Sequence, residues 1–247
     1  MSAAKLYLLD VEGTVAPLTL TSEVLFPYAR KHFESFLNAS IHDPAVLKDL
    51  MELKRDNLAE TDPRAPTLRL TGEIDIFFLS SEIGIPLVLK YLLWLMDRDR
   101  KSTALKSLQG KIWKAGFESG ELNGTVFPDV PPAFERWAAN GKVAIYSSGS
   151  VEAQKLFFRY SSHGDLSPLI SGYFDTRTGP KMEPASYAAI AAAMSVDPVE
   201  AMFFSDVVRE LDAARDAGFE TRLVVRPGNP PVDDAHGHPS IESFALL

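Results

Sequence analysis

The sequence predicts an α/β fold in which a parallel β-sheet is interrupted by an all-helical insertion. Two observations support this. A short apolar run at 5–9 precedes Asp10, and further short apolar runs alternate with helical patterns after residue 140. The block between them has apolar residues only at helical spacing. Short strands that alternate with helices of 10–15 residues are typical of βαβ units, whose crossovers make a sheet parallel.

The elements of the expected sheet domain follow from apolar runs bounded by turn signals such as Asn140-Gly141. We expect strands at 5–9, 142–146, 170–174, 201–204 and 222–225. We expect helices at 131–139, 150–160, 184–194 and 207–217. The tail from Pro227 is rich in Pro, Asp, His and Gly, and we expect a surface segment with His236 and His238 in solvent.

The regular elements expected in the inserted block are all helices, because apolar residues recur there every three to four positions. Helices are predicted at 22–37, 43–58, 73–97 and 102–117, the third interrupted near Gly84 and Pro86, and a polar loop at 59–72. The expected domains are therefore a core of 1–15 plus 126–247 and a helical insertion of 16–125.

Composition excludes several classes of function. The 247 residues include 25 Lys and Arg against 33 Asp and Glu, so the net charge of −8 argues against nucleic-acid partners. The lack of cysteine excludes disulfides, thiolate zinc sites and a cysteine nucleophile. Apolar runs such as 92–96 are far shorter than the ~20 residues of a membrane span. We therefore expect a cytoplasmic protein with no membrane partner.

Polar residues follow three of the predicted strands. Asp10-Val11-Glu12-Gly13-Thr14 follows the first, Ser147-Ser148-Gly149-Ser150 the second, and Ser205-Asp206 the fourth, with Glu210 four residues further on. Gly179-Pro180-Lys181 precedes the helix at 184–194. Ligands bind outside the carboxyl ends of the strands in open parallel sheets, so these residues are expected to form one site.

The residue types of this site fit phosphoryl chemistry. Asp10 and Asp206 supply the hard oxygen ligands that Mg²⁺ prefers, and Glu210 is either a further ligand, a partner of one, or a surface residue. Serine hydroxyls and amides at a helix start bind phosphate, and Lys181 offsets its charge. Beside a metal, an aspartate can attack phosphorus, and Glu12, two residues from Asp10, can supply a proton.

In their order along the chain, the segments that contain Asp10, Ser147, Lys181 and Asp206 resemble the four motifs of the haloacid dehalogenase superfamily of aspartyl phosphatases. Most members have an aspartate two residues after the nucleophile, where this chain has Glu12. That difference is similar to the enolase-phosphatases of methionine salvage, as are the segments 25–28, 99–106, 108–110, 146–156 and 225–229. The resemblance implies a Rossmann-like core and an inserted all-helical cap.

The resemblance also implies a reaction, the conversion of 2,3-diketo-5-methylthiopentyl 1-phosphate to an acireductone and phosphate with Mg²⁺ as cofactor. Asp10 would be the nucleophile and a metal ligand, and Asp206 the second carboxylate on the metal. Glu12 would be the general acid and base, and would reach the metal through its backbone carbonyl. The base of the enolisation is not identified, and Glu12, one methylene longer than aspartate, is our hypothesis for it.

The remaining implied roles concern the substrate. Ser147 and Ser148 would hold the phosphate, and Lys181 would neutralise it and orient Asp10. Phe26, Trp94 and Trp113 are candidates for the wall of an apolar pocket for the thioether tail, although aromatic residues on amphipathic helices are usually core. We expect a monomer.

Two alternatives to this function remain. The first is a superfamily phosphatase that acts on another small phosphoester. The second is a phospho-accepting signalling domain, which uses the same residue types but is expected to be shorter, to lack a helical insertion and to carry its phosphoaspartate on a middle strand.

Overall fold

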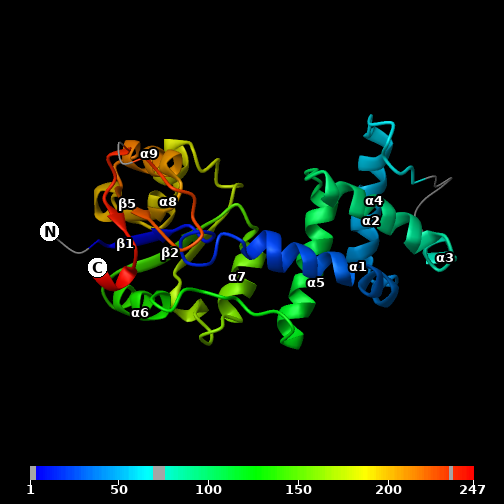
Figure 1. The fold of residues 1–247 in the computed structure, drawn as a ribbon, viewed down its shortest axis with the longest axis horizontal. Helices are drawn as coiled ribbons and strands as arrows, with labels where there is room; N and C mark the ends of the chain where they lie inside the picture. The colour runs from blue at the N-terminus through cyan, green and yellow to red at the C-terminus, as the bar shows by residue number, and fades with distance from the viewer. Residues whose placement is uncertain (1–3, 69–75, 234–235) are drawn as a thin grey trace. The chain divides into compact units, whose positions relative to one another are not determined.

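The chain forms two compact units in a computed structural model that describes residues 4–68, 76–233 and 236–247. The first unit comprises Met1–Glu23 and Phe117–Leu247, and the second comprises Val24–Gly116. Figure 1 shows the strands in the first unit, and helices α1, α2 and α4 in the second.

The first unit is built on a parallel sheet, as the sequence predicts. Among the described residues its six strands lie in the order β3-β2-β1-β4-β5-β6, and every pairing is parallel. The strands are β1 (Leu6–Leu9), β2 (Lys142–Tyr146), β3 (Gly172–Phe174), β4 (Ala201–Ser205), β5 (Glu220–Val224) and β6 (Ser240–Ile241). In register, Leu8 lies opposite Ala144 on one side and Phe203 on the other. A strand with neighbours on both sides and helices on both faces must be apolar throughout, as β1 is.

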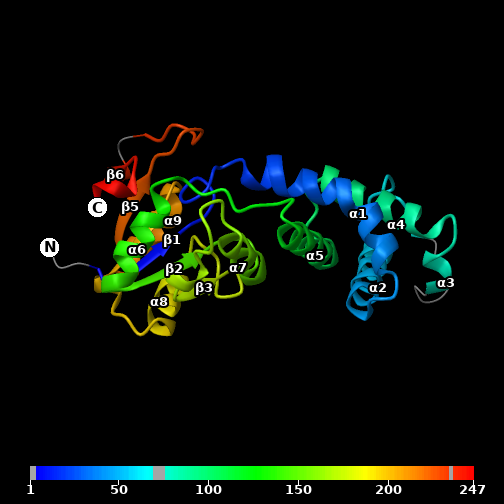
Figure 2. The same ribbon diagram turned by 90° about the horizontal axis from the view of Figure 1, so that it is seen from below.

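Helices cover both faces of this sheet (Figures 1 and 2). They are α6 (Val130–Asn140), α7 (Val151–Arg159), α8 (Pro184–Ala193) and α9 (Val208–Asp216), with short 3₁₀ segments η2 (Ser167–Leu169), η3 (Pro198–Glu200) and η5 (Phe244–Leu246). Alternate side chains of β1 point to opposite faces. Leu6 and Leu8 belong to the buried cluster that includes Tyr187 of α8 and Leu211 of α9. Tyr7 stacks on Trp137 of α6 at 4.7 Å between ring centroids.

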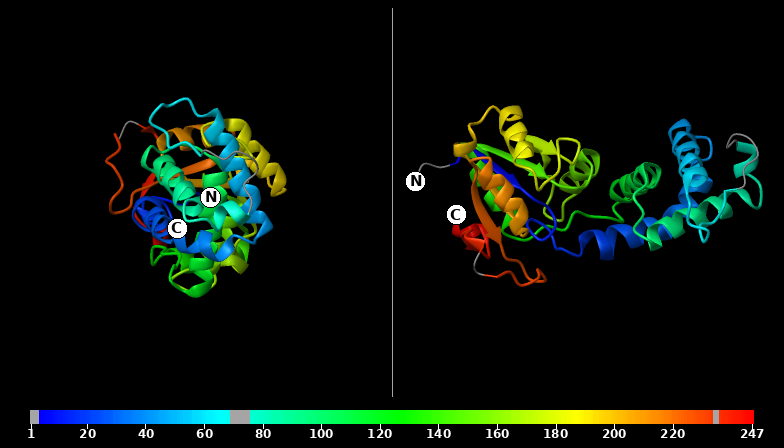
Figure 3. Two further views of the ribbon diagram at one scale, coloured as in Figure 1. Left: turned by 90° about the vertical axis from the view of Figure 1, so that its right-hand side faces the viewer. Right: turned by 90° about the horizontal axis from the view of Figure 1, so that it is seen from above.

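The C-terminal tail differs from the sequence expectation of a surface segment. It contributes β6 and η5, the red segment in Figure 3, and buries Ile241 and Phe244. His238 is also buried, with Nδ1 2.8 Å from the Thr221 hydroxyl and Nε2 3.1 Å from Asp212 Oδ1. The expectation of a solvated His238 is therefore wrong. A two-residue strand carries no periodicity, so the sequence gives no signal for this packing.

The second unit is helical in its described part. A π-helical turn, η1 (Leu20–Leu25), leads into α1 (Phe26–Ser40), followed by α2 (Pro44–Ala59), α3 (Ile76–Leu79), α4 (Gly84–Asp97) and α5 (Thr103–Ser119). Asp43 begins α2 by accepting the Ala45 N–H at 2.8 Å. The break expected near Gly84 and Pro86 is the start of α4, where Pro86 lies in the first turn.

The helices of the second unit share a single buried cluster of side chains. Its members include Phe33 of α1, Leu50 and Leu53 of α2, Tyr91 and Leu92 of α4, and Leu108 of α5. The predicted loop at 59–72 has no helix or strand over 60–68, and its last four residues lie outside the described part of the chain. None of the described helices combines the length and apolar character needed to cross a membrane.

Candidate active site

Two aspartates lie side by side at the carboxyl edge of the sheet, because they follow neighbouring parallel strands. Asp10 follows β1, and its N–H donates to the carbonyl of Phe204 in β4 at 2.9 Å. Asp206 follows β4, whose Phe204 is in register with Leu9. The Asp10 carboxylate is fixed locally, since Oδ1 accepts the Val11 N–H at 2.8 Å. Both carboxyl groups are buried.

Lys181 joins Asp10 to Glu210. Its Nζ lies 2.6 Å from Asp10 Oδ1 and 2.7 Å from Glu210 Oε2, and each of the three side chains is 10% exposed. The Ser205 hydroxyl also donates to Glu210 Oε2 at 3.0 Å. The sequence left the position of Glu210 open. The structure places it in the site as the second carboxylate on the lysine.

The loop that carries Lys181 is held by three side chains that sequence reasoning missed. The Tyr146 hydroxyl donates to the Gly179 carbonyl at 2.8 Å, the Ser186 hydroxyl to the Pro180 carbonyl at 2.8 Å, and the Tyr187 hydroxyl to the Lys181 carbonyl at 2.7 Å. Three successive carbonyls are thus fixed from β2 and the first turn of α8. The signal in the sequence was limited to Ser186 and Tyr187, which follow Lys181 closely.

Gly13 allows the loop after Asp10 to pass against Asp206. Its φ is +71°, and a Cβ built at this position would lie 2.4 Å from Asp206 Oδ2. Any other residue would clash with that carboxylate and would also be strained in the left-handed region. The glycine therefore sets the separation between the Asp10 loop and Asp206.

Burial and mutual repulsion shift the pKa values of these groups. Burial, and then the neighbouring Asp10, raise the pKa of Asp206 to about 6. The same two causes raise the pKa of Glu210 to about 7, against the opposing effect of Lys181. Burial acts to lower the pKa of Lys181, but Asp10 and Glu210 raise it overall. Among the described side chains of this site, the ammonium group of Lys181 thus contacts two of three buried carboxyl groups.

The second strand supplies the hydroxyl side of the site. Ser147 follows β2, the other neighbour of β1, and is buried, with its Oγ accepting the Gly149 N–H at 3.2 Å. Ser148 is exposed. Ser150 caps α7 by accepting the Ala153 N–H at 3.2 Å. This turn presents a hydroxyl and a helix start at the edge where Asp10 lies, an arrangement suited to an anion.

Glu12 lies on the same loop as Asp10 but bonds away from Lys181. Its Oε1 accepts the Thr21 N–H at 3.0 Å, just ahead of the connection to the second unit, and the residue is half-buried. Its charge contributes to the raised pKa of Asp206, so the two carboxyl groups interact. A half-buried carboxyl group beside the aspartates is available for proton transfer.

The donors present fit a hard divalent cation. The expected ligands are two carboxylates, Asp10 and Asp206, and the backbone carbonyl of Glu12, all of which are oxygen donors. A cation beside Asp206 would relieve the repulsion from Asp10 that raises the Asp206 pKa. Within residues 4–68, 76–233 and 236–247, no group of three or more His, Asp and Glu side chains is arranged to hold a metal ion.

The sequence and the fold match a known class of enzyme. The model of the haloacid dehalogenase-like hydrolases matches residues 4–218, and the chain belongs to this family. At 17% identity, the structure of CbbY from Rhodobacter sphaeroides supports the fold alone, with a TM-score of 0.54 over 98% of this chain and 95% of that one.

Much more similar relatives share one name, Enolase-phosphatase E1. One from Synechococcus elongatus is 52% identical over 92% of this chain and 90% of the relative, and one from Danio rerio is 44% identical over 91% and 86%. The crystal structure of the UTR4 protein from Saccharomyces cerevisiae is 33% identical, covers 99% of this chain and 100% of that one, and has a TM-score of 0.79. The chain is therefore an enzyme, a phosphatase similar over nearly its whole length to the enolase-phosphatases.

Proposed function

We propose that this enzyme is a Mg²⁺-dependent enolase-phosphatase that converts 2,3-diketo-5-methylthiopentyl 1-phosphate to an acireductone and phosphate. One observation carries the proposal, namely the buried contact of Asp10 with Lys181 at the carboxyl end of β1, with Asp206 directly after the neighbouring strand β4. The identity of up to 52% to proteins named Enolase-phosphatase E1 supports the choice of substrate.

The phosphatase half of the reaction proceeds through Asp10. Its carboxylate attacks the phosphorus, the bond from phosphorus to the ester oxygen breaks, and Glu12 gives its proton to that oxygen. Water then attacks the phosphorus of the aspartyl phosphate, Glu12 takes the proton, and Asp10 is regenerated with release of inorganic phosphate. Ser147 and Ser148 hold the phosphate, and Lys181 orients Asp10 and offsets the negative charge.

Mg²⁺ would be held by Asp10, Asp206 and the carbonyl of Glu12, and when bound it supplies positive charge that reduces the repulsion between the phosphoryl group and the Asp10 carboxylate. Glu210 is a positioning residue in this scheme. It keeps the ammonium group of Lys181 charged and in place, since the ammonium group is shared between the two carboxylates.

The enolase half requires removal of a proton from the carbon beside a carbonyl. We propose Glu12 as the base, because its side chain is one methylene longer than the usual aspartate and can reach both the carbon acid and the ester oxygen. The variant Glu12→Asp tests this directly. Full rates of enol formation and phosphate release in Glu12→Asp would rule out the proposal.

We propose that the inserted segment 16–125, most of which forms the second unit, acts as a cap over the site, with 1–15 plus 126–247 as the core. Closure would exclude water from the aspartyl phosphate. Phe26 and Trp113, whose rings stack at 6.3 Å, and Trp94 are candidates for the wall around the methylthio tail. Replacement of Trp113 by alanine should raise KM for the methylthio substrate more than KM for a small phosphoester, and equal effects on both would exclude the residue.

The first experiment mixes the enzyme with the diketo phosphate and Mg²⁺, and follows enol formation by absorbance and phosphate release in the same sample. An enol signal followed by phosphate, both lost with a chelator and in Asp10→Asn, is the expected result. Phosphate release from other esters with no action on this substrate would leave a phosphatase of another small phosphoester. Gel filtration and cell fractionation test our further expectation of a cytoplasmic monomer.

A further inference from the structure

The segment after β5 forms a tight turn that the proposed function does not use. The carbonyl of Arg226 accepts the N–H of Asn229 at 3.0 Å, and Pro227 and Gly228 lie between them, with Gly228 at φ +93°. Proline followed by a residue with positive φ is the pattern of a type II β-turn. The sequence Arg-Pro-Gly-Asn therefore encodes a turn whose first and fourth residues lie close together.

Both of these residues reach the loop that follows Asp10. Arg226 Nε donates to the carbonyl of Thr14 at 3.0 Å, and Asn229 Nδ2 donates to the carbonyl of Gly13 at 2.9 Å. Asn229 Nδ2 also donates to the carbonyl of Val224, at 3.2 Å, which ties the amide to the end of β5. Two consecutive peptide groups of the Asp10 loop are thus held by one turn from the far end of the chain.

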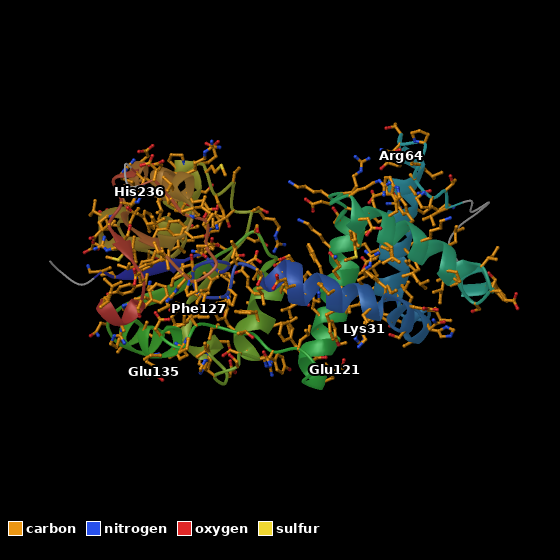
Figure 4. The ribbon with its side chains drawn as sticks, in the orientation of Figure 1. Lys31, Arg64, Glu121, Phe127, Glu135 and His236 are labelled. Carbon is orange, nitrogen blue, oxygen red and sulfur yellow. The ribbon has the colours of Figure 1, made fainter. Side chains whose placement is uncertain are left out.

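The guanidinium of Arg226 is itself held rigidly. It is buried and lies between two aromatic rings, 4.5 Å from the centroid of Phe127 (labelled in Figure 4) and 4.6 Å from that of Phe244. Arg226 Nη1 donates to Asp129 Oδ2 at 2.9 Å and to the carbonyl of Glu242 at 3.1 Å. Because these contacts already fix the Arg226 side chain, it loses little conformational entropy when Nε binds the loop after Asp10. A fixed side chain therefore holds that loop effectively.

Asp129 completes this support. Its Oδ2 also accepts the Ser243 hydroxyl at 2.9 Å and the Phe244 N–H at 2.7 Å. Although burial opposes it, the hydrogen bonds from Arg226 and Phe244 lower the pKa of Asp129 overall, so the carboxylate stays charged opposite Arg226. The C-terminal segment and the start of α6 are therefore joined through one ion pair to the loop of the site.

We propose that Arg226 and Asn229 are positioning residues for catalysis, which hold the peptides of Gly13 and Thr14 so that Asp10 and Asp206 keep their separation. The inference rests on the proposed role of Asp10 as nucleophile. Gly13 is the point where a shift matters most, because its Cα already faces Asp206 closely enough to exclude a Cβ. A loop displaced by ~1 Å loses the geometry of the reacting groups, at a cost that can reach 100-fold in rate.

The test compares Asn229→Ala and Asn229→Asp with the control Asn140→Ala. Asn140 likewise donates its side-chain amide to a backbone carbonyl, that of Arg136 at 3.2 Å, but at the end of α6. Phosphate release is measured with the diketo phosphate and with p-nitrophenyl phosphate. Hydrogen exchange of the peptide that contains 11–16 is measured on the same proteins.

We expect both Asn229 variants to lower kcat about 10-fold or more with KM changed less than about 2-fold, and to accelerate exchange in 11–16. Asn140→Ala should match the wild type in both measurements. Asn229→Asp keeps the shape of the side chain, but its ionised carboxyl group cannot donate and would face the carbonyls of Gly13 and Val224, so it should lose at least as much activity as Asn229→Ala. Wild-type kcat and exchange in Asn229→Asp would overturn the inference.

The two proposals fail differently. If the wild-type enzyme releases no phosphate from either ester, the proposed function fails, and the exchange of 11–16 alone decides whether the turn supports the loop. If the wild type is active and the Asn229 variants equal Asn140→Ala in kcat, the proposed function stands and the positioning role is refuted.

Discussion

Replacing Lys181 by methionine would remove the positive charge from between Asp10 and Glu210 while preserving most of the side-chain volume. Both carboxylates contact the same nitrogen, at 2.6 and 2.7 Å, and all three side chains are 10% exposed. Two oxygens bonded to one nitrogen lie within about 5 Å of each other, and at an effective dielectric constant of about 20 their charges repel by about 3 kcal/mol.

At pH 8 we therefore expect Lys181→Met to lower the free energy of unfolding by about 3–5 kcal/mol, the usual cost of leaving a buried charge unpaired. The loss should depend on pH. The pKa of Glu210 is already raised to about 7 in the folded protein, and without Lys181 it rises further. A carboxyl group with a pKa higher in the folded than in the unfolded state favours folding below its unfolded pKa, and this effect is lost as pH rises through the folded pKa. The loss of stability should thus be small near pH 5, where Glu210 is protonated, and should grow as the pH rises above 7.

The assay is urea unfolding followed by circular dichroism at pH 5 and pH 8, with a chelator present so that no cation replaces the lysine. The double variant Lys181→Met/Glu210→Gln is the control, because it removes one of the two repelling charges and should recover most of the loss at pH 8. A loss below about 1 kcal/mol at pH 8, or an equal loss at both pH values, would refute this reasoning.

Three further predictions concern other parts of the first unit. Trp137→Ala removes a buried ring stacked on its neighbours and should cost about 3–5 kcal/mol in denaturant unfolding, and a cost below about 1 kcal/mol would contradict the packing. Gly13→Ala should reduce the rate of phosphate release at least ~10-fold. The control is Gly120→Ala, which has a similar φ of +78° but nothing within 4 Å of its Cβ and should leave activity intact. Equal effects of the two substitutions would exclude a clash with Asp206 as the cause. Burial lowers the pKa of His238, so its contribution to stability is present above its unfolded pKa and is lost as pH falls. His238→Gln should therefore flatten the decline in unfolding free energy from pH 7.5 to pH 5, and an unchanged slope would show that His238 does not cause it.

Most of the sheet could be predicted from the sequence, because its strands are apolar runs between clear turn signals. The strand at 142–146 matches β2 in both limits, and the alanine-rich helix at 184–194 matches α8 to within one residue. The tail could not be predicted in this way. The two residues of β6 are ordered by pairing with β5 and by Phe244 packing on Trp137, which are contacts with distant parts of the chain.

The site residues that directly follow a strand could be predicted from the sequence. Asp10, Ser147 and Asp206 follow β1, β2 and β4, so the sheet alone brings them to one edge. The second partner of Lys181, Glu210, was not predictable, because a glutamate in the first turn of a helix is equally common on a surface. The hydroxyls of Tyr146 and Tyr187 had the same ambiguity, since each is also part of the apolar core.

The position of β1 in the sheet affects how the protein is made. β1 is the third of six strands across the sheet but is synthesised before the others, and its neighbours β2 and β4 follow it by more than a hundred residues. At ~5–20 residues per second, this apolar strand lacks its neighbours for roughly 7–27 seconds, the time in which the contiguous unit 24–116 is synthesised. An unpaired apolar strand is a target for chaperones during this interval. Because Lys181 and Asp206 are added only late in synthesis, a nascent chain that stops before them carries Asp10, the proposed nucleophile, without the lysine that contacts it.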